Sequence, residues 1–369
     1  MSTAISLAYE SIALAHPNPH VGAVVVKNGR NIGEGFHEYE KRDHAEIVAL
    51  QRAGAKARGA TMYVTLEPCC HQGRTGPCTK AIIAAGIARV VMAMRDPNPR
   101  VAGRGIAELR RAGIEVSVGT DERNARRLNE DFAKWIRTGL PFVTLKSALT
   151  LDGKIAMHPG TATPITGRSA REAVQRLRHA SDALITGIGT VLADDPLLTD
   201  RTREPRRRAL LRVVVDSRLR LPAKSRLVKS ASRDLLVFTT QSLESAKARA
   251  LQKAGVEIVR TRPRNRRGRV CLDSMLAELG RREIVSAMIE AGAELNGAAL
   301  EAGIVDKMIL FYAPKIMGPG AVPMARVSPK WFAKSPALDN ISVNWYGPDF
   351  AVEGYFHDVY GNHGARRKD

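Results

Sequence analysis

Four residues near the N-terminal end of the chain have the types and spacing of a catalytic metal site. His44 stands two residues before Glu46, and Cys69 is followed by Cys78 across a loop of eight residues. One imidazole and two thiolates are typical zinc ligands, and three protein ligands leave a fourth position for water. Water bound there loses its proton near neutral pH and becomes a nucleophile. We therefore predict a zinc centre of His44, Cys69 and Cys78, with Glu46 moving the protons.

His-x-Glu followed by Pro-Cys and a second cysteine is typical of zinc-dependent deaminases of amino-substituted heterocycles. The two cysteines are usually closer together, so the spacing here indicates an enlarged loop between the ligands. A non-catalytic zinc site is an alternative, because Cys70 or His71 could supply a fourth ligand. We interpret Cys70 as a bystander, since adjacent residues rarely both point into one small site. Cys271 is most simply a small buried side chain.

Length and composition indicate a soluble two-domain enzyme. The chain has 369 residues, 44% of them hydrophobic, and a formal net charge of +20. Much of that charge lies in residues 201–212 and 260–269, which lack the interleaved aromatics of a surface that binds nucleic acid. We therefore expect arginine-rich surface loops and no nucleic-acid partner. No apolar run has the length of a membrane span, and nothing resembles a secretory signal, so we expect a cytoplasmic enzyme without membrane contact.

Two α/β sheets should position these residues. In the first half, strands predicted at 21–26, 61–66, 89–93 and 114–118 alternate with helices at 45–53, 79–85 and 106–112, and Asn28-Gly29 forms a turn. An amphipathic stretch at 122–137 leads to Gly139-Leu140-Pro141, where we place the domain boundary. The second half continues with strands at 142–148, 183–186, 212–215, 235–239, 256–259, 284–289 and 307–312, and with helices at 169–179 and 243–254. This alternation predicts an α/β sheet in each domain, 1–139 and 140–369.

Longer motifs resemble one family along nearly the whole chain. They are His-Pro-Asn-Pro-His-Val-Gly at 16–22, His-Ala-Glu at 44–46, Thr-Leu-Glu-Pro-Cys-Cys-His-Gln-Gly-Arg-Thr-Gly-Pro-Cys at 65–78 and Asp-Pro-Asn-Pro at 96–99. The second half adds Leu-Lys-Ser-Ala-Leu-Thr-Leu-Asp-Gly-Lys at 145–154 and Ala-Pro-Lys-Ile-Met-Gly at 313–318. Together they resemble the bifunctional deaminase/reductase of riboflavin biosynthesis.

The resemblance implies a cytidine-deaminase-like three-layer α/β/α domain followed by a dihydrofolate-reductase-like α/β domain. The first would hydrolyse the 2-amino group of 2,5-diamino-6-(5-phosphoribosylamino)pyrimidin-4(3H)-one, using Zn²⁺. The second would then reduce the ribosyl group to ribityl with NADPH. A phosphorylated pyrimidine would be the substrate, and the protein would be a homo-oligomer.

Family likeness also implies the residues of each site. The deaminase substrate would contact Asn18, His37, His71 and Arg74. The cofactor would contact Ala148, Pro164, Thr190, Asp194, Ser217, Gly292, Ala293, Glu294, Leu295, Asn296, Gly297 and Ala298. The reductase substrate would contact Ala162, Arg178, Leu198, Arg201 and Glu290. Two of these have independent support, because Gly292 precedes a helix whose amides could bind phosphate, and Glu290 is a carboxylate ending an apolar strand.

Two alternatives remain open from the sequence. One is a deaminase of a nucleoside or an RNA base, with an inactive or binding C-terminal domain. The other is a reductase domain that keeps its fold without turnover, since Ala162 and Pro164 stand where relatives often carry Ser and Trp. Residues 187–189, Gly-Ile-Gly, follow a predicted strand but lack the third glycine of a dinucleotide fingerprint.

Overall fold

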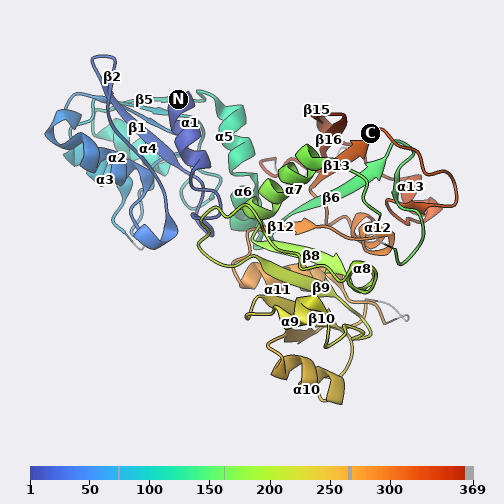
Figure 1. Cartoon of the computed structure of the whole chain (residues 1–369). Helices are drawn as coiled ribbons and strands as arrows, with labels where there is room; N and C mark the ends of the chain where they lie inside the picture. The colour runs from blue at the N-terminus through green and yellow to red at the C-terminus, as the bar shows by residue number, and fades with distance from the viewer. Residues whose placement is uncertain (74, 162, 265–267, 362–369) are drawn as a thin grey trace. The chain divides into compact units, whose positions relative to one another are not determined.

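The computed structural model describes residues 1–73, 75–161, 163–264 and 268–361 (Figure 1). Two compact units are present: residues 1–139 with 205–207 and the chain from 359, and residues 140–204 with 208–358. The predicted residues Arg74 and Ala162 lie outside the described part. Within that part, no helix combines the length and the apolar character needed to cross a membrane.

The first unit is built on a five-stranded sheet in the order β2-β1-β3-β4-β5. Strand β1 is antiparallel to β2 and β3, whereas β3, β4 and β5 are parallel. The strands are β1 (Gly22–Lys27), β2 (Arg30–Phe36), β3 (Thr61–Val64), β4 (Arg89–Met92) and β5 (Glu115–Val118). The helices are α1 (Ser2–Tyr9), α2 (Ala45–Ala53), α3 (Cys78–Ala84), α4 (Arg104–Arg111), α5 (Glu122–Leu128) and α6 (Glu130–Thr138), with 3-10 turns η1 (Tyr39–Lys41) and η2 (Gly54–Ala57).

Helices cover both faces of this sheet. A Cβ on Gly22 would lie 2.1 Å from Ala4 O of α1, and one on Gly35 would lie 2.8 Å from Ala45 O of α2. Gly35 pairs with Ala23, the neighbour of Gly22, so the two glycines face opposite sides of the sheet. Helices α1 and α2 therefore lie on opposite faces, and glycine lets each backbone approach the strands.

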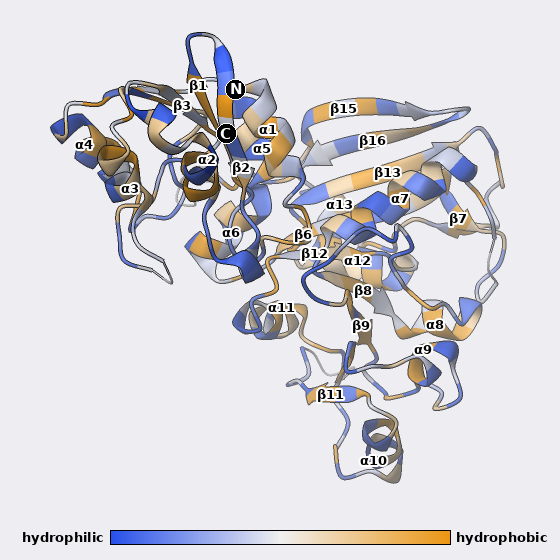
Figure 2. Cartoon of the chain, turned by 60° about the vertical axis from the view of Figure 1, so that its left-hand side comes forward, coloured by the Kyte–Doolittle hydropathy of each residue, from blue (hydrophilic) through white to orange (hydrophobic). Residues whose placement is uncertain are grey.

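Helix α4 shows how the outer layer is patterned. Ile106 and Leu109 are buried, whereas Arg110 and Arg111 are exposed. The hydrophobic and hydrophilic stripes of this helix are visible in Figure 2. This is the pattern of a helix that packs one side on a sheet.

The second unit contains a nine-stranded sheet in the order β11-β10-β9-β8-β12-β6-β13-β16-β15. The first seven strands of that order are parallel, and β16 and β15 are antiparallel additions at one edge. A two-stranded sheet pairs β7 with β14. The strands are β6 (Phe142–Thr150), β7 (Lys154–Ala156), β8 (Ala183–Gly187), β9 (Leu211–Val215), β10 (Leu235–Thr239), β11 (Glu257–Arg260), β12 (Ser286–Ile289), β13 (Lys307–Ala313), β14 (Val322–Pro323), β15 (Asp339–Tyr346) and β16 (Asp349–Tyr355).

Helices accompany the parallel strands of this unit. They are α7 (Arg168–Ala180), α8 (Ile188–Asp194), α9 (Arg226–Lys229), α10 (Ala246–Lys253), α11 (Leu272–Arg281), α12 (Ala293–Glu301) and α13 (Pro329–Phe332). All five residues of β10 are buried, as expected for a parallel strand covered on both faces. The prediction of two α/β sheets is confirmed, while the limits 1–139 and 140–369 of independent domains stay a prediction.

Candidate active sites

The four residues of the predicted metal centre meet where strands end and helices begin in the first unit. His44 is the N-cap of α2, and Glu46 lies in the first turn of that helix. Cys69 follows β3, and Cys78 is the first residue of α3. A helix N-terminus favours negative charge, which partly offsets the burial of the Cys78 thiol and the Glu46 carboxyl.

The distances between these side chains suit a tetrahedral zinc ion. His44 Nδ1 lies 3.2 Å from Cys78 Sγ and 3.5 Å from Cys69 Sγ. Zinc bonds of about 2.0–2.3 Å to nitrogen and sulfur place tetrahedral ligand atoms roughly 3.3–3.8 Å apart. The main-chain N–H of Cys78 donates to Cys69 Sγ at 3.3 Å, which fixes that sulfur between strand and helix. The donor set therefore fits zinc.

The protein groups alone already prepare one thiolate. A hydrogen bond from the Cys78 thiol, assisted by His44, lowers the pKa of Cys69 to about 4. The hydrogen bond to Cys69 raises the pKa of His44 to about 9. The same contact with Cys69, together with burial, raises the pKa of Cys78 well above its usual value. Zinc binding must therefore release protons, and zinc affinity should rise with pH.

Glu46 has the environment of a proton carrier. Its side chain is buried, and burial raises the pKa of the carboxyl. A raised pKa makes a carboxyl a better proton acceptor and donor near neutral pH, which suits general acid–base chemistry.

Of the residues predicted to contact the deaminase substrate, Asn18 and His37 are brought together. His37 Nδ1 lies 2.9 Å from the carbonyl oxygen of Asp43, and His37 Nε2 lies 3.0 Å from Asn18 Nδ2. Since the carbonyl only accepts, a neutral His37 donates from Nδ1, and its Nε2 accepts from the Asn18 amide. This assigns the Asn18 amide orientation. The His37 ring is edge-on to that of His44, with 5.2 Å between centroids, whereas His71 is exposed on the loop between the cysteines.

Sequence reasoning did not assign roles to two further carboxylates near the metal ligands. Glu67 is buried and accepts from the main-chain N–H groups of Gly103 at 2.9 Å, Ile106 at 3.2 Å and Asp96 at 3.3 Å. It thus anchors the start of α4. Burial raises the pKa of Asp96 to about 7. The Glu-Pro-Cys and Asp-Pro-Asn-Pro motifs carried the only sequence signal for both residues.

In the second unit, Glu290 lies between two cations at the end of β12. Its Oε1 accepts from Lys146 Nζ at 2.9 Å, and its Oε2 accepts from Arg178 Nη2 at 2.9 Å. Burial alone would raise the pKa of Glu290, but Lys146 and Arg178 outweigh it and hold the pKa at about 2. Lys146 was not predicted, and its signal was a lysine inside the apolar strand β6, where lysine is rarely buried without a partner.

The loop after α8 carries the other predicted contacts of the reductase substrate. Arg178 Nη1 donates to Thr199 O at 3.0 Å, which ties this loop to α7. The main-chain N–H of Arg201 donates to Gln175 Oε1 at 2.9 Å, and the Arg201 side chain is exposed. Leu198 is buried and its side chain packs in the hydrophobic core. Its backbone φ is 54°.

The predicted cofactor residues in and before α12 form two groups, one at the helix N-terminus and one facing the protein interior. Gly292 is the N-cap, and among the described residues no side chain caps this helix. A Cβ on Gly292 would lie 3.9 Å from Thr190 Oγ1, so the starts of α8 and α12 are neighbours. Asn296 and Gly297, in contrast, face inward. Asn296 Nδ2 donates to Met324 O at 2.9 Å, and a Cβ on Gly297 would lie 1.9 Å from Arg326 O.

The remaining predicted cofactor residues lie as follows. Those of α12 are Ala293 and Leu295, which are buried, Ala298, which is half-buried, and Glu294, whose exposed carboxylate pairs with Arg269 at 3.4 Å and Arg326 at 3.3 Å. Elsewhere, Ala148 is half-buried on β6, Asp194 ends α8, Pro164 is exposed, and the Ser217 hydroxyl after β9 accepts from Val270 N at 3.0 Å.

Comparisons with known proteins agree with both sites. Residues 141–352 match the model of the RibD C-terminal domain, and residues 1–94 match the zinc-binding region of cytidine and deoxycytidylate deaminases. The chain is 42% identical over 366 residues to riboflavin biosynthesis protein RibD of Escherichia coli strain K12, covering 95% of this chain and 97% of that one. The chain belongs to the RibD family. It thus joins a deaminase domain and a reductase domain of riboflavin biosynthesis, and the predicted bifunctional enzyme is confirmed.

Solved RibD structures share the fold. Acinetobacter baumannii RibD, form 1, is 38% identical with a TM-score of 0.85 and covers 97% of this chain and 98% of that chain. A Thermotoga maritima protein, titled diaminohydroxyphosphoribosylaminopyrimidine deaminase/5-amino-6-(5-phosphoribosylamino)uracil reductase, is 38% identical with a TM-score of 0.83 and covers 97% of both chains. The predicted fold class is confirmed. A binding module in place of the reductase domain is set aside, because residues 141–352 match the reductase domain of the family.

Proposed function

We propose that this RibD chain removes the 2-amino group of 2,5-diamino-6-(5-phosphoribosylamino)pyrimidin-4(3H)-one and then reduces the ribosyl group with NADPH. The observation that carries this proposal is the buried Glu46 beside a His-Cys-Cys donor set, in a chain with a reductase domain. The T. maritima relative, titled for both activities, supports the choice of substrate.

In the deaminase half, His44, Cys69 and Cys78 would hold zinc, which supplies a Lewis acid that activates water. Glu46 would take one proton of the attacking water and deliver it to the ring nitrogen. It would then take the second proton from the new hydroxyl on the ring carbon and deliver it to the amino group, which leaves as ammonia. Asn18, oriented by His37, would present its side-chain oxygen to an N–H of the pyrimidine. His71 and Arg74 would also contact this substrate.

In the reductase half, NADPH would supply the hydride. The open N-terminus of α12 at Gly292 would bind a cofactor phosphate through backbone amides, with Thr190 beside it. Glu290 is ionised and fixed by Lys146 and Arg178, so it can orient hydroxyl groups of the ribosyl chain by accepting their hydrogen bonds. The inward-facing Asn296 and Gly297 would shape this end of α12 without side-chain contact to the cofactor.

The other predicted contacts keep the same roles in this proposal. The cofactor would also meet Ala148, Pro164, Asp194, Ser217, Ala293, Glu294, Leu295 and Ala298, and the substrate would also meet Ala162, Leu198 and Arg201. We further propose a cytoplasmic homo-oligomer with no nucleic-acid partner. Its two domains, 1–139 and 140–369, would each contain one active site.

Isotope transfer tests both halves. Zinc-loaded enzyme is incubated with the diaminopyrimidinone in ¹⁸O water, then with NADPH deuterated at the transferable hydride, and products are analysed by mass spectrometry. The proposal expects ¹⁸O on the ring after the first step and deuterium on the sugar chain after the second. A ring product without ¹⁸O would contradict the substrate assignment. Deuterated NADH is tested in parallel, and equal deuterium transfer from NADH and NADPH would contradict the cofactor assignment.

A further inference from the structure

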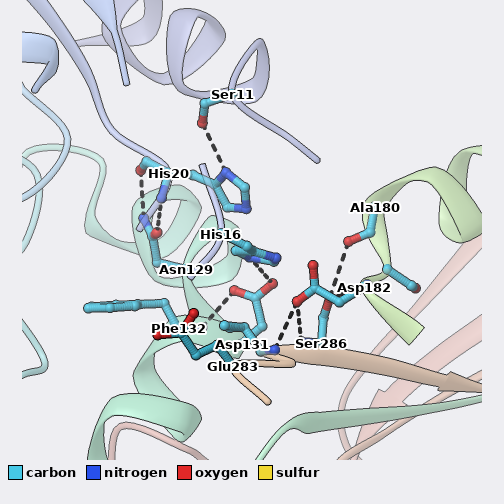
Figure 3. A network of polar contacts seen from close by, with 12 residues as sticks. Ser11, His16, His20, Asn129, Asp131, Phe132, Ala180, Asp182, Glu283 and Ser286 are labelled. Carbon is cyan, nitrogen blue, oxygen red and sulfur yellow. Dashed lines mark hydrogen bonds and ion pairs between the residues drawn. The ribbon is translucent and has the colours of Figure 1, made fainter. Parts of the chain in front are cut away.

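A second group of possible metal ligands lies in the first unit, outside the zinc centre. His16 and His20 belong to the segment between α1 and β1, and Asp131 lies in the first turn of α6. One ligand atom from each of the three residues lies within 4.8 Å of the others. Both histidines are 3% exposed, and the Asp131 side chain is 15% exposed. Figure 3 shows the two imidazoles and the carboxylate converging from the loop and the helix.

The hydrogen bonds around His20 leave one ring nitrogen as a lone-pair donor. Ser11 Oγ donates its single proton to Ala8 O at 2.7 Å, and it lies 2.9 Å from His20 Nδ1. The hydroxyl oxygen then accepts from His20 Nδ1–H, so that nitrogen carries the proton in the neutral ring. His20 Nε2 then holds the lone pair, on the side of the ring facing His16 (Figure 3). A hydrogen-bonded Nδ1–H that orients a ligating Nε2 is a recurring feature of metal-binding histidines.

The backbone of His20 is fixed as well. Asn129 Oδ1 accepts from His20 N at 2.7 Å, and Asn129 Nδ2 donates to His20 O at 3.0 Å. Asn129 is the N-cap of α6, directly before the helix that carries Asp131. These bonds fix the position of the loop relative to α6. Less conformational entropy of the protein is therefore lost when a metal ion binds.

Asp131 faces His16 from the first turn of α6. Its Oδ1 accepts from Phe132 N at 2.7 Å, so Oδ2 faces His16 Nε2, 3.1 Å away. Tetrahedral nitrogen and oxygen ligands at about 2.0–2.1 Å from zinc are separated by roughly 3.3 Å. The His16–Asp131 pair already has about this spacing, and the ligand atom of His20 lies within 4.8 Å of both.

We propose that His16, His20 and Asp131 form a second divalent metal site, with zinc as its occupant. A donor set of two imidazoles and one carboxylate binds first-row divalent transition-metal ions in preference to magnesium or calcium. The ion would link the segment between α1 and β1 to α6. Asn18 lies between the two histidines in this loop, so occupancy would hold Asn18 in position for the deaminase substrate.

Zinc stoichiometry tests the site independently of catalysis. Full-length protein is stripped with chelator, titrated with ZnCl₂, gel-filtered and assayed for zinc by mass spectrometry. The proposal expects two zinc ions per wild-type chain, one in the Cys69→Ser/Cys78→Ser variant, and none when His20→Asn is added. The exposed control His158→Asn should keep both ions. One ion in the wild type, or two in His20→Asn, would overturn the proposal.

Two further variants keep the test decisive. Asp131→Asn provides a second ligand change if His20→Asn fails to fold. Ser11→Ala leaves all three ligands in place but removes the partner of His20 Nδ1, together with the bond to Ala8 O, and it should weaken zinc binding at this site about 10- to 100-fold. Unchanged affinity in Ser11→Ala and in Asp131→Asn would show a simple buried His–Asp pair. With Co²⁺ in the Cys69→Ser/Cys78→Ser background, the site should give d–d bands without thiolate charge transfer.

The deaminase consequence is a separate readout that rests on the proposed function. Loss of the second ion should raise KM for the diaminopyrimidinone and leave kcat nearly unchanged, because Glu46 and the catalytic ligands are intact. If the zinc counts match while the pyrimidine is not a substrate, the metal site stands and the substrate assignment fails.

Discussion

Neutralising Glu290 should destabilise the reductase unit strongly and in a pH-dependent way. Lys146 and Arg178 lower the pKa of Glu290 from 4.5 to about 2, and the side chain is only 22% exposed. A difference of roughly 2.5 pKa units corresponds to about 3 kcal/mol of unfolding free energy at neutral pH. Glu290→Gln should lose about that amount, because Lys146 would be left buried beside a neutral amide.

The sign of the pH dependence follows from the lowered pKa. Above pH 4.5 the carboxyl is ionised in both folded and unfolded chains, so the full stabilisation is present. As the pH falls from about 4.5 towards 2, the unfolded chain binds a proton that the folded chain does not. The stability difference between wild type and Glu290→Gln should therefore shrink below pH 4.5.

Thermal unfolding followed by calorimetry measures this effect. On the proposed cofactor assignment, the transition of the reductase unit is the one that NADPH would shift upward. For a unit of this size, about 2–4 °C per kcal/mol predicts a fall in Tm of roughly 6–12 °C at pH 7. Glu294→Gln is the matched control, since the ion pairs of Glu294 with the described residues Arg269 and Arg326 are exposed and worth about 0–1 kcal/mol. Equal Tm shifts in the two variants would refute the buried network as a stabilising element.

Three further predictions concern the metal site and the packing of α12. Glu46→Gln should keep its zinc but lose about 10²- to 10⁴-fold in kcat for deamination, measured as ammonia release; unchanged turnover would remove Glu46 from the chemistry. Cys70→Ser should retain the catalytic zinc that Cys69→Ser loses, measured by metal analysis; loss in both would make Cys70 a ligand. Gly297→Ala should lower the reductase Tm, because its Cβ would lie 1.9 Å from Arg326 O, whereas Gly320→Ala, with open space around it, should not.

Elements with a regular burial pattern were predictable from sequence, whether one face or the whole element is buried. Helix α2 (Ala45–Ala53) and strand β10 (Leu235–Thr239) have the predicted limits. Strand β2 was missed, because Gly33 and Gly35 interrupt its pattern. The structure explains both glycines: a Cβ on Gly33 would lie 2.3 Å from Ala49 O, so the helix packs directly on the strand backbone.

Tertiary contacts decided what the local pattern could not. The amphipathic stretch 122–137 divides into α5 and α6 at Asn129, whose side chain bonds the backbone of His20 far away in sequence. The edge strand β15 was also missed. Its Ile341 and Trp345 are 61% and 71% exposed, so no buried period marks it.

The same difference between local pattern and tertiary contacts applies to the candidate sites. His44, Glu46, Cys69 and Cys78 are close in sequence and form a recognisable pattern, so they could be predicted together. The partnership of Lys146 with Glu290 spans 144 residues and depends on β6 and β12 being neighbours in the sheet. One sequence cannot show that adjacency. The pairing of His37 with Asn18 was accessible only through family likeness.

The central claim is that one chain performs both reactions in a fixed order. The most direct measurement is turnover of the diaminopyrimidinone ribosyl phosphate by zinc-loaded protein, with ammonia and NADPH followed in the same reaction. The account predicts ammonia release without NADPH, and NADPH oxidation only after deamination. No ammonia from zinc-loaded protein, or NADPH oxidation before any deamination, would contradict it.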